Sequence, residues 1–187
     1  MTGKRVGLCI CGSFCNFSQA LPVIRALSCS NEVTPVLSFA AQDTDTRFYK
    51  AADFINDVIS ATRKTPVLTL SDAEKTTGAF DIILILPCTG NTLAKLARGI
   101  CDTPPLMAAK AHLRNGKPLV IAFSSNDALS SGAANIGELL NRKNVYFVPF
   151  SQDDPDKKPR SAASRFGLCE KTLEKALEGV QLEPILA

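Results

Sequence analysis

The chain contains one histidine, His112, and no Cys-x-x-Cys pair among its seven cysteines. Transition metals are bound mainly by clustered histidine and cysteine side chains, so we expect no metal site. An odd number of cysteines in 187 residues also argues against a disulfide framework. Free thiols in a reducing cytoplasm are the simplest explanation. We expect Cys9 and Cys11, within an apolar strand, to pack as small apolar residues on opposite faces of a sheet.

No stretch approaches 18 consecutive apolar residues, and the N-terminus lacks the pattern of a signal peptide. We therefore expect a cytoplasmic protein with no membrane partner. The net charge is only +3, from 21 basic and 18 acidic residues. The one dense basic run, at residues 154–160, is mixed with acids and reads as a solvated segment. This charge pattern does not favour nucleic acid as a partner.

Two common nucleotide-binding motifs are missing. A dinucleotide site requires G-x-G-x-x-G after the first strand and an acid at the end of the second. Here the first loop, in "GLCICGSF", has a single glycine at the turn, Gly12, and the second strand ends in Ser38. No G-x-x-x-x-G-K-[ST] sequence is present either. NAD and P-loop nucleotide binding are therefore disfavoured for this chain.

Apolar runs alternate with segments of helical spacing along the whole chain. We expect strands at residues 5–11, 33–39, 66–70, 81–87, 117–125 and 144–150. Helices are expected at residues 17–27, 44–62, 92–100, 105–116, 128–143 and 166–179, with a capped turn at 71–75. Continuous apolar strands between helices are typical of a parallel sheet covered on both faces. The prediction is one doubly wound, Rossmann-like (flavodoxin-like) α/β domain over residues 1–187, with a flap or arm at 151–165.

Small polar residues follow four of the expected strands. The loops at residues 11–16, 38–46, 87–92 and 123–128 are rich in hydroxyl and amide side chains. In an open parallel sheet, ligands bind outside the carboxyl ends of the strands, and helix N-termini there favour anions. FMN, with one phosphate and a ring rich in hydrogen-bonding groups, fits such an edge best. The alternative for each loop is that its hydroxyl only caps a helix.

The residues of this edge resemble a known family. "GS" at 12–13, Ser38 and "PCTGNT" at 87–92 resemble the FMN-binding family of homo-oligomeric flavin-containing cysteine decarboxylases. The longer motifs "TDTRF", "PCTGNTLAKLA", "DTPPLMAAKAHLRNGKPLV", "SSNDAL" and "VPFSQDDPDKKP" are similar to the dipicolinate synthase B-subunit branch of this fold. The resemblance implies a trimer-based homo-oligomer in the mother cell of a sporulating bacterium. It implies a partner A subunit that binds NAD or NADP. The pair would oxidise a dihydrodipicolinate-type dicarboxylate to dipicolinate.

The resemblance also implies cofactor-binding residues at the strand ends. Gly12 and Ser13 would contact the FMN phosphate, with Ser38 close by. The remaining candidates would line the ring and close the pocket: Thr89, Gly90, Asn91, Thr92, Ser124, Ser125 and Asn126. Met107 and Ala108 would border the ring.

The chain departs from the decarboxylase pattern because residues 40–70 contain no histidine. His112 reads as a surface or packed residue, so no catalytic base is assigned. The catalytic candidates are Arg47 and Cys88. Arg47 is suited to a substrate carboxylate, unless it pairs with Asp45. Cys88 either fits the turn as a small residue or acts in redox chemistry.

Two other functions stay open at this point. The first is a non-catalytic subunit with a vestigial flavin pocket that stabilises the A subunit, which the missing histidine favours. The second is a flavin prenyltransferase-like enzyme. That chemistry needs basic residues near the flavin to hold a prenyl phosphate, and "FSSNDA" at 123–128 offers none.

Overall fold

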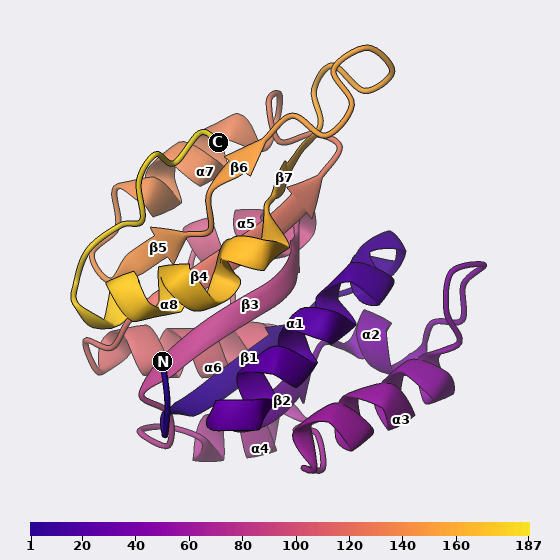
Figure 1. Ribbon diagram of the computed structural model, residues 1–187, viewed down its shortest axis with the longest axis vertical. Coiled ribbons are helices and arrows are strands. Elements are labelled where there is room, and N and C mark those ends of the chain that lie inside the picture. Colours follow the sequence, from indigo (N-terminus) through magenta and orange to yellow (C-terminus); the bar gives the residue numbers. More distant parts are fainter.

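A seven-stranded sheet forms the centre of the protein, seen here in a computed structural model that describes residues 1–187 (Figure 1). The strand order is β2-β1-β3-β4-β7-β6, and β5 pairs with the first half of β4. Their bounds are β1 Arg5–Ile10, β2 Glu32–Leu37, β3 Ile82–Thr89, β4 Leu119–Ser125, β5 Val145–Phe147, β6 Phe150–Ser151 and β7 Ala162–Ser164. Strands β1 to β5 pair in parallel, and β7 is antiparallel to β4 and β6. The mainly parallel, flavodoxin-like sheet is confirmed.

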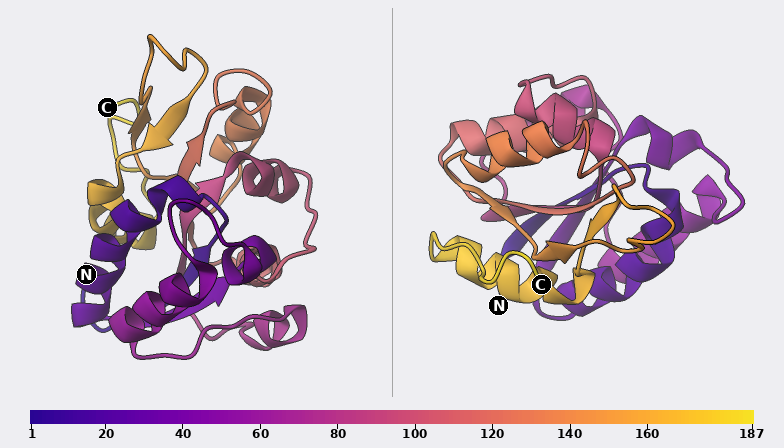
Figure 2. Two further views of the ribbon diagram at one scale, coloured as in Figure 1. Left: turned by 90° about the vertical axis from the view of Figure 1, so that its right-hand side faces the viewer. Right: turned by 90° about the horizontal axis from the view of Figure 1, so that it is seen from above.

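Helices cover both faces of this sheet (Figure 2). Their bounds are η1 Phe14–Asn16, α1 Phe17–Ser30, α2 Phe39–Asp43, α3 Ala51–Thr62, α4 Leu70–Lys75, α5 Gly90–Ala97, α6 Pro104–Arg114, α7 Ala133–Leu140, η2 Phe166–Leu168 and α8 Cys169–Leu177. One face packs against α4, α5, α6 and α7, and the other packs against α1, α3 and α8. The protein is therefore doubly wound, with two apolar layers.

Strand β3 shows why the sheet is central. Its residues from Ile82 to Cys88 are all buried, which requires cover on both faces. Ile83 and Ile85 pack on the α4–α7 side, whereas Leu84 packs on the α1–α8 side. Cys9 and Cys11 both belong to the α4–α7 side. The expectation that they face opposite ways is wrong, because residues two apart in a strand share a face.

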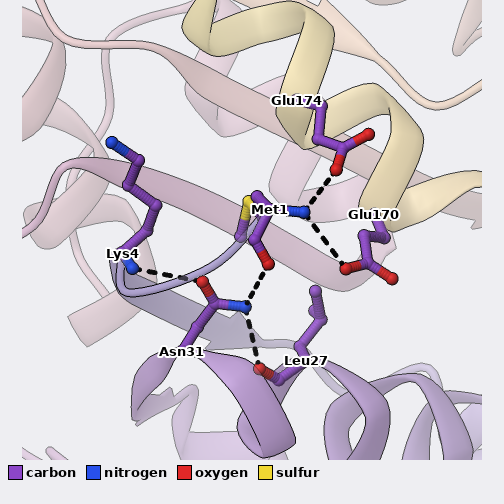
Figure 3. A network of polar contacts seen from close by, with 6 residues as sticks. All are labelled: Met1, Lys4, Leu27, Asn31, Glu170 and Glu174. Atoms are coloured by element: carbon purple, nitrogen blue, oxygen red, sulfur yellow. Dashed lines mark hydrogen bonds and ion pairs between the residues drawn. The ribbon is translucent and has the colours of Figure 1, made fainter.

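The N-terminal segment joins the start of β1 to α8 and α1 (Figure 3). The Met1 ammonium group pairs with Glu174 and lies 3.3 Å from a carboxylate oxygen of Glu170. The Asn31 amide donates to the carbonyls of Met1 and Leu27, at 3.3 and 3.0 Å, and its oxygen accepts from the Lys4 N–H. These contacts hold α8, from the far end of the sequence, against the first βα unit.

Two expected elements between β2 and β3 are wrong. Residues 44–62 are not one helix, because α3 begins only at Ala51, where the Asp45 carboxylate accepts the Ala51 N–H at 2.9 Å. Asp45 therefore caps α3, and no ion pair joins it to Arg47. The expected strand at 66–70 is reduced to one bridge between Val36 and Val67. Thr69 ends it, since its hydroxyl accepts the Asp72 N–H and starts α4.

Residues 151–165 belong to a β-hairpin and its loop. The strand expected at 144–150 is present as β5 but ends at Phe147, and two further short strands follow. Strands β6 and β7 form the hairpin, and residues 152–161 project from it at the top of Figure 1. Ser124 pairs with Ala163, and the Phe123 N–H donates to the Ser164 hydroxyl at 3.0 Å. The hairpin therefore extends the sheet beside the carboxyl end of β4. No helix has both the length and the apolar character needed to cross a bilayer.

Candidate functional site

The carboxyl ends of four parallel strands meet at one edge of the sheet. The Ser38 N–H donates to the Ile10 carbonyl at 2.9 Å, and the Cys11 N–H donates to the Pro87 carbonyl at 3.2 Å. Thr89 at the end of β3 pairs with Ser124 in β4. The chain leaves β1 for β2 on one side and returns to β3 on the other. Such a reversal between β1 and β3 opens a crevice where ligands bind in this topology.

Two glycines bring bare backbone to this edge. A Cβ atom on Gly12 would lie 2.9 Å from the Ala40 Cβ and 3.2 Å from the Phe14 ring. A Cβ atom on Gly90 would lie 2.6 Å from the Ser125 hydroxyl. Neither position has room for a side chain, so the two glycines let neighbouring loops pack closely against each other at this edge.

The first turn of α5 opens directly onto the edge. Its N-cap is Thr89, whose hydroxyl accepts the Thr92 N–H at 3.1 Å and lies 3.0 Å from the Thr92 hydroxyl. Ser38 caps α2 in the same way, through the Ala41 N–H at 3.3 Å. The helix-cap alternative thus holds for these hydroxyls. The N–H groups at the start of α5, without intrahelical partners, remain suited to an anion.

A cavity of about 540 Å³ lies between the ends of β3 and β4 and the start of α7. Its lining residues are Gly90, Asn91, Ala94, Ser125, Asn126, Asp127, Ser131, Gly132 and Asn135. Four of the expected site residues, Gly90, Asn91, Ser125 and Asn126, are therefore brought together. The lining is polar and almost uncharged, and Asp127 is its one titratable side chain. Such a surface favours a neutral, hydrogen-bonding ligand face.

Asp127, Ser131 and Asn135 were missed from the sequence because residues 128–132 fold back instead of continuing a helix. The N–H groups of Ser130 and Gly132 donate to the Asp127 carbonyl at 3.0 and 2.9 Å. This turn carries the N-terminus of α7 against the Gly90 loop. The available signal was the Ser-Ser-Gly run at 130–132, which is typical of a turn.

Other expected residues lie at or beside the edge without lining this cavity. Gly12 and Ser13 follow β1, where the Ser13 hydroxyl accepts from the Asn16 amide at 2.8 Å. Arg47 lines a different cavity, of about 650 Å³, between the loop at 44–50 and α3. Its guanidinium lies 4.8 Å from the centre of the exposed Phe48 ring. Within one chain, Arg47 and the Gly90 loop thus belong to separate cavities.

The remaining candidates are partly or fully buried. Met107 is half-buried and packs against the α4–α7 side of the core. Cys88 is fully buried under the Thr89 loop, and burial raises the pKa of its thiol well above the usual value. A hydrogen bond from Cys88 lowers the pKa of the neighbouring Cys11 thiol. His112 is 2% exposed and bonds to the Pro118 carbonyl at 2.9 Å; burial lowers its pKa to about 4. His112 is therefore a packed, neutral histidine, which is one of the two alternatives expected from the sequence.

The donor set fits FMN. Two glycine cradles allow close contact, the α5 N-terminus suits one phosphate, and hydroxyls and amides suit the ring edge. No lysine or arginine lines the cavity at the strand ends, so it does not offer the cations that a second, prenyl phosphate group needs.

Comparison with known proteins agrees with this assignment. The flavoprotein family model matches residues 1–155, and the chain belongs to this flavoprotein family. It is 40% identical to the dipicolinate synthase B subunit of Bacillus subtilis (strain 168), over all of this chain and 94% of that one. The crystal structure of the dipicolinate synthase B subunit from Bacillus halodurans C is also 40% identical, with a TM-score of 0.91 over 100% and 97% of the two chains. The FMN-dependent cysteine decarboxylase SpaF shares the fold, at 22% identity, a TM-score of 0.68 and coverage of 94% and 95%.

Proposed function

We propose that the chain is the flavin-binding subunit of a two-subunit dipicolinate synthase. With an A subunit that binds NAD or NADP, it oxidises a dihydrodipicolinate-type precursor to dipicolinate in the mother-cell cytoplasm of a sporulating bacterium. The observation that carries the proposal is the polar, nearly uncharged cavity where β3 and β4 end, beside the Gly90 loop. The full-length similarity to dipicolinate synthase B subunits supports the choice of reaction.

The cradle assigns a binding role to each loop. Gly12 and Ser13, with Ser38, hold the FMN phosphate. The loop from Thr89 to Thr92 faces the phosphate and ring, and the loop from Ser124 to Asn126 closes the pocket. A bound flavin would supply a two-electron acceptor beside the substrate, and the nicotinamide cofactor of the A subunit would be the final acceptor of the two electrons. The amides and hydroxyls of this chain orient the two planar molecules and keep water from the contact.

Oxidation of the dihydropyridine ring to an aromatic ring removes one hydrogen as a proton and one as a hydride. Asp127 takes the proton, because its carboxylate is the one titratable group that lines the cavity. The amides of Asn91 and Asn126 orient the substrate carboxylates there. Arg47 binds a carboxylate from a second cavity, and in a trimer-based homo-oligomer it serves the site of a neighbouring copy.

One observation favours a second candidate function. The chain lacks a histidine at the strand ends, because its one histidine is packed in α6 and bonded to a carbonyl. A protein with a structural flavin pocket that only stabilises the A subunit would need no base. The two candidates differ in what happens when Asp127 loses its charge.

The test reconstitutes the purified chain with FMN, the A subunit and a nicotinamide cofactor, and follows dipicolinate formation. The proposal predicts turnover only when both proteins are present. Asp127→Asn should lower the rate by about 100-fold or more without changing FMN affinity, while Asp153→Asn, an exposed carboxylate in the hairpin loop, should have no effect. If Asp127→Asn is fully active, its role as the base is refuted. If both proteins are needed but turnover is the same without FMN, the catalytic role of the flavin is refuted and the stabilising role takes its place.

A further inference from the structure

A third cavity lies at the opposite end of α5 from the Gly90 loop. Its volume is about 310 Å³, at the lower end of the range for small-ligand sites. The residues that line it come from α5 and the segment after it, from α6 and from the segment after α7: Leu96, Gly99, Ile100, Leu106, Lys110, Leu113, Arg114, Arg142 and Lys143. None of these residues lines the cavity at the strand ends. We call this third cavity the basic cleft.

Four of its nine lining residues are basic and none is acidic. The Arg142 guanidinium is held in place by the carbonyls of Leu96 and Ala97, at 3.0 and 2.9 Å, and by the Glu138 carboxylate at 3.0 Å. Arg114 and Lys143, by contrast, take part in none of the ion pairs within the chain. A cleft lined by charge of one sign concentrates the electrostatic field and attracts counter-ions.

Positions near helix C-termini explain Arg142 and also Arg114, in the last turn of α6, but not Lys110. The guanidinium of Arg142 satisfies the last carbonyls of α5, a normal role for a basic residue there. The Lys110 ammonium donates only to the Cys101 thiol, at 3.4 Å. Lys110 and Arg114 are four residues apart and share one face of α6. They therefore present two positive groups side by side to the same opening.

The floor of the basic cleft is apolar. Leu96 and Leu106 are buried there, Leu113 is half-buried, and Ile100 is 47% exposed. Cations around an apolar floor suit a ligand with a flat apolar body and carboxylates at its edge. A free inorganic anion would gain no binding free energy from the apolar floor, and a neutral ring would gain none from the surrounding cations.

We propose that the basic cleft is a second binding site, specific for an aromatic dicarboxylate. One carboxylate contacts Lys110 and Arg114, the other contacts Lys143 and the fixed Arg142, and the ring covers the leucines. The choice of pyridine-2,6-dicarboxylate as the ligand rests on the proposed function, in which it is the product. A ligand of about 12 non-hydrogen atoms fits the volume, and we expect a Kd of about 0.1–1 mM. Helix α5 lines both cavities, because Leu96 near its end faces the basic cleft and Asn91 near its start faces the cavity at the strand ends.

The test titrates the isolated, FMN-free chain with pyridine-2,6-dicarboxylate, by calorimetry and by amide chemical shifts. We expect saturable binding that shifts the amides of α6 and residues 141–143. The double variant Lys110→Gln/Arg114→Gln should weaken binding at least tenfold. The matched control Lys171→Gln/Lys175→Gln removes two cations at the same spacing from α8 and should leave Kd unchanged. The single variant Lys143→Gln, at an exposed position, should weaken binding severalfold without risk to folding.

Comparison ligands identify the recognised chemistry. Benzene-1,3-dicarboxylate should bind like the pyridine compound, whereas benzoate and inorganic phosphate should each bind at least fivefold more weakly. Equal losses in the cleft and control variants, equally tight phosphate binding, or no saturable binding would each overturn the proposal. The assay uses no flavin, partner or turnover, so its result is separate from that of the proposed function. A chain that is inactive in dipicolinate synthesis can still bind the dicarboxylate in the basic cleft, and a chain that is active in synthesis can fail to bind it there.

Discussion

Substitution of Gly90 by alanine tests the packing of the strand-end cradle most sharply. The new Cβ would lie 2.6 Å from the Ser125 hydroxyl oxygen and 3.3 Å from the Ser125 Cβ. Both distances are shorter than a van der Waals contact, so the loops after β3 and β4 must move apart or Ser125 must rotate into the cavity. Either response disturbs the surface that we assign to the flavin.

The magnitude follows from two opposing terms. Overpacking of a tight contact costs about 1–3 kcal/mol, and the better helix propensity of alanine at the start of α5 offsets at most about 1 kcal/mol. The free energy of unfolding should therefore fall by about 1–2 kcal/mol, which lowers Tm by about 2–8 °C in a domain of this size. FMN binding should weaken about tenfold or more, since a loss of about 1.4 kcal/mol corresponds to a factor of ten.

The assay is urea unfolding of the FMN-free chain, followed by FMN titration of the same variants. Gly137→Ala is the control, because nothing lies within 4 Å of the Cβ added there, in the middle of α7. It should stabilise the protein by about 0.5–1 kcal/mol and leave FMN affinity unchanged. Gly90→Ala/Ser125→Ala should regain most of the lost stability, because the nearest overlapping atom is gone. If Gly90→Ala is as stable as the parent and binds FMN equally well, the cradle is wrong.

Three further predictions test other parts of the account. Thr89→Ala and Thr69→Ala each remove a helix N-cap, and each should lower the free energy of unfolding by about 1 kcal/mol. Only Thr89→Ala should also weaken FMN binding. If the two variants have the same FMN affinity, the N-terminus of α5 is not part of the cofactor site. In the folded state, the pKa of His112 is lowered from 6.5 to about 4. The neutral, buried imidazole therefore contributes up to about 3 kcal/mol to the free energy of unfolding. This contribution is fully present above pH 6.5 and is lost as the pH falls towards 4. The single imidazole signal in the NMR spectrum should titrate near pH 4, and a midpoint near 6.5 would contradict its burial. Among the seven thiols, the exposed Cys15 and Cys29 should react first with a thiol reagent in native protein, and rapid modification of four or more would show that the buried set is accessible.

Some elements followed directly from local sequence. The apolar run from Ile82 to Leu86 predicted a strand buried on both faces, and the structure has it as β3. The convergence of the loops after β1, β2, β3 and β4 also followed, because parallel strands place their carboxyl ends at one edge. Gly90, Asn91 and Ser125 were therefore assigned correctly to one region.

Other features depend on contacts that no local pattern contains. The start of α3 is fixed by Asp45, six residues before Ala51 in the chain, so helical periodicity alone overextended the helix. Val67 has strand-like neighbours but only one bridge to β2, since Thr69 begins a helix. Asp127 joined the site through a turn that folds residues 128–132 back onto it. The periodicity of apolar residues carries no information on these contacts between separate segments of the chain.

The central claim is that the edge formed by Gly12, Ser38, Gly90 and Ser125 is an FMN site. Its most direct test is the absorbance spectrum of the purified chain after addition of FMN and removal of the excess, with Gly90→Ala in parallel. The account predicts that the flavin bands stay with the parent chain, one FMN per chain, and are reduced in the variant. Failure of the parent chain to retain or bind FMN, alone and again with the A subunit present, would contradict it.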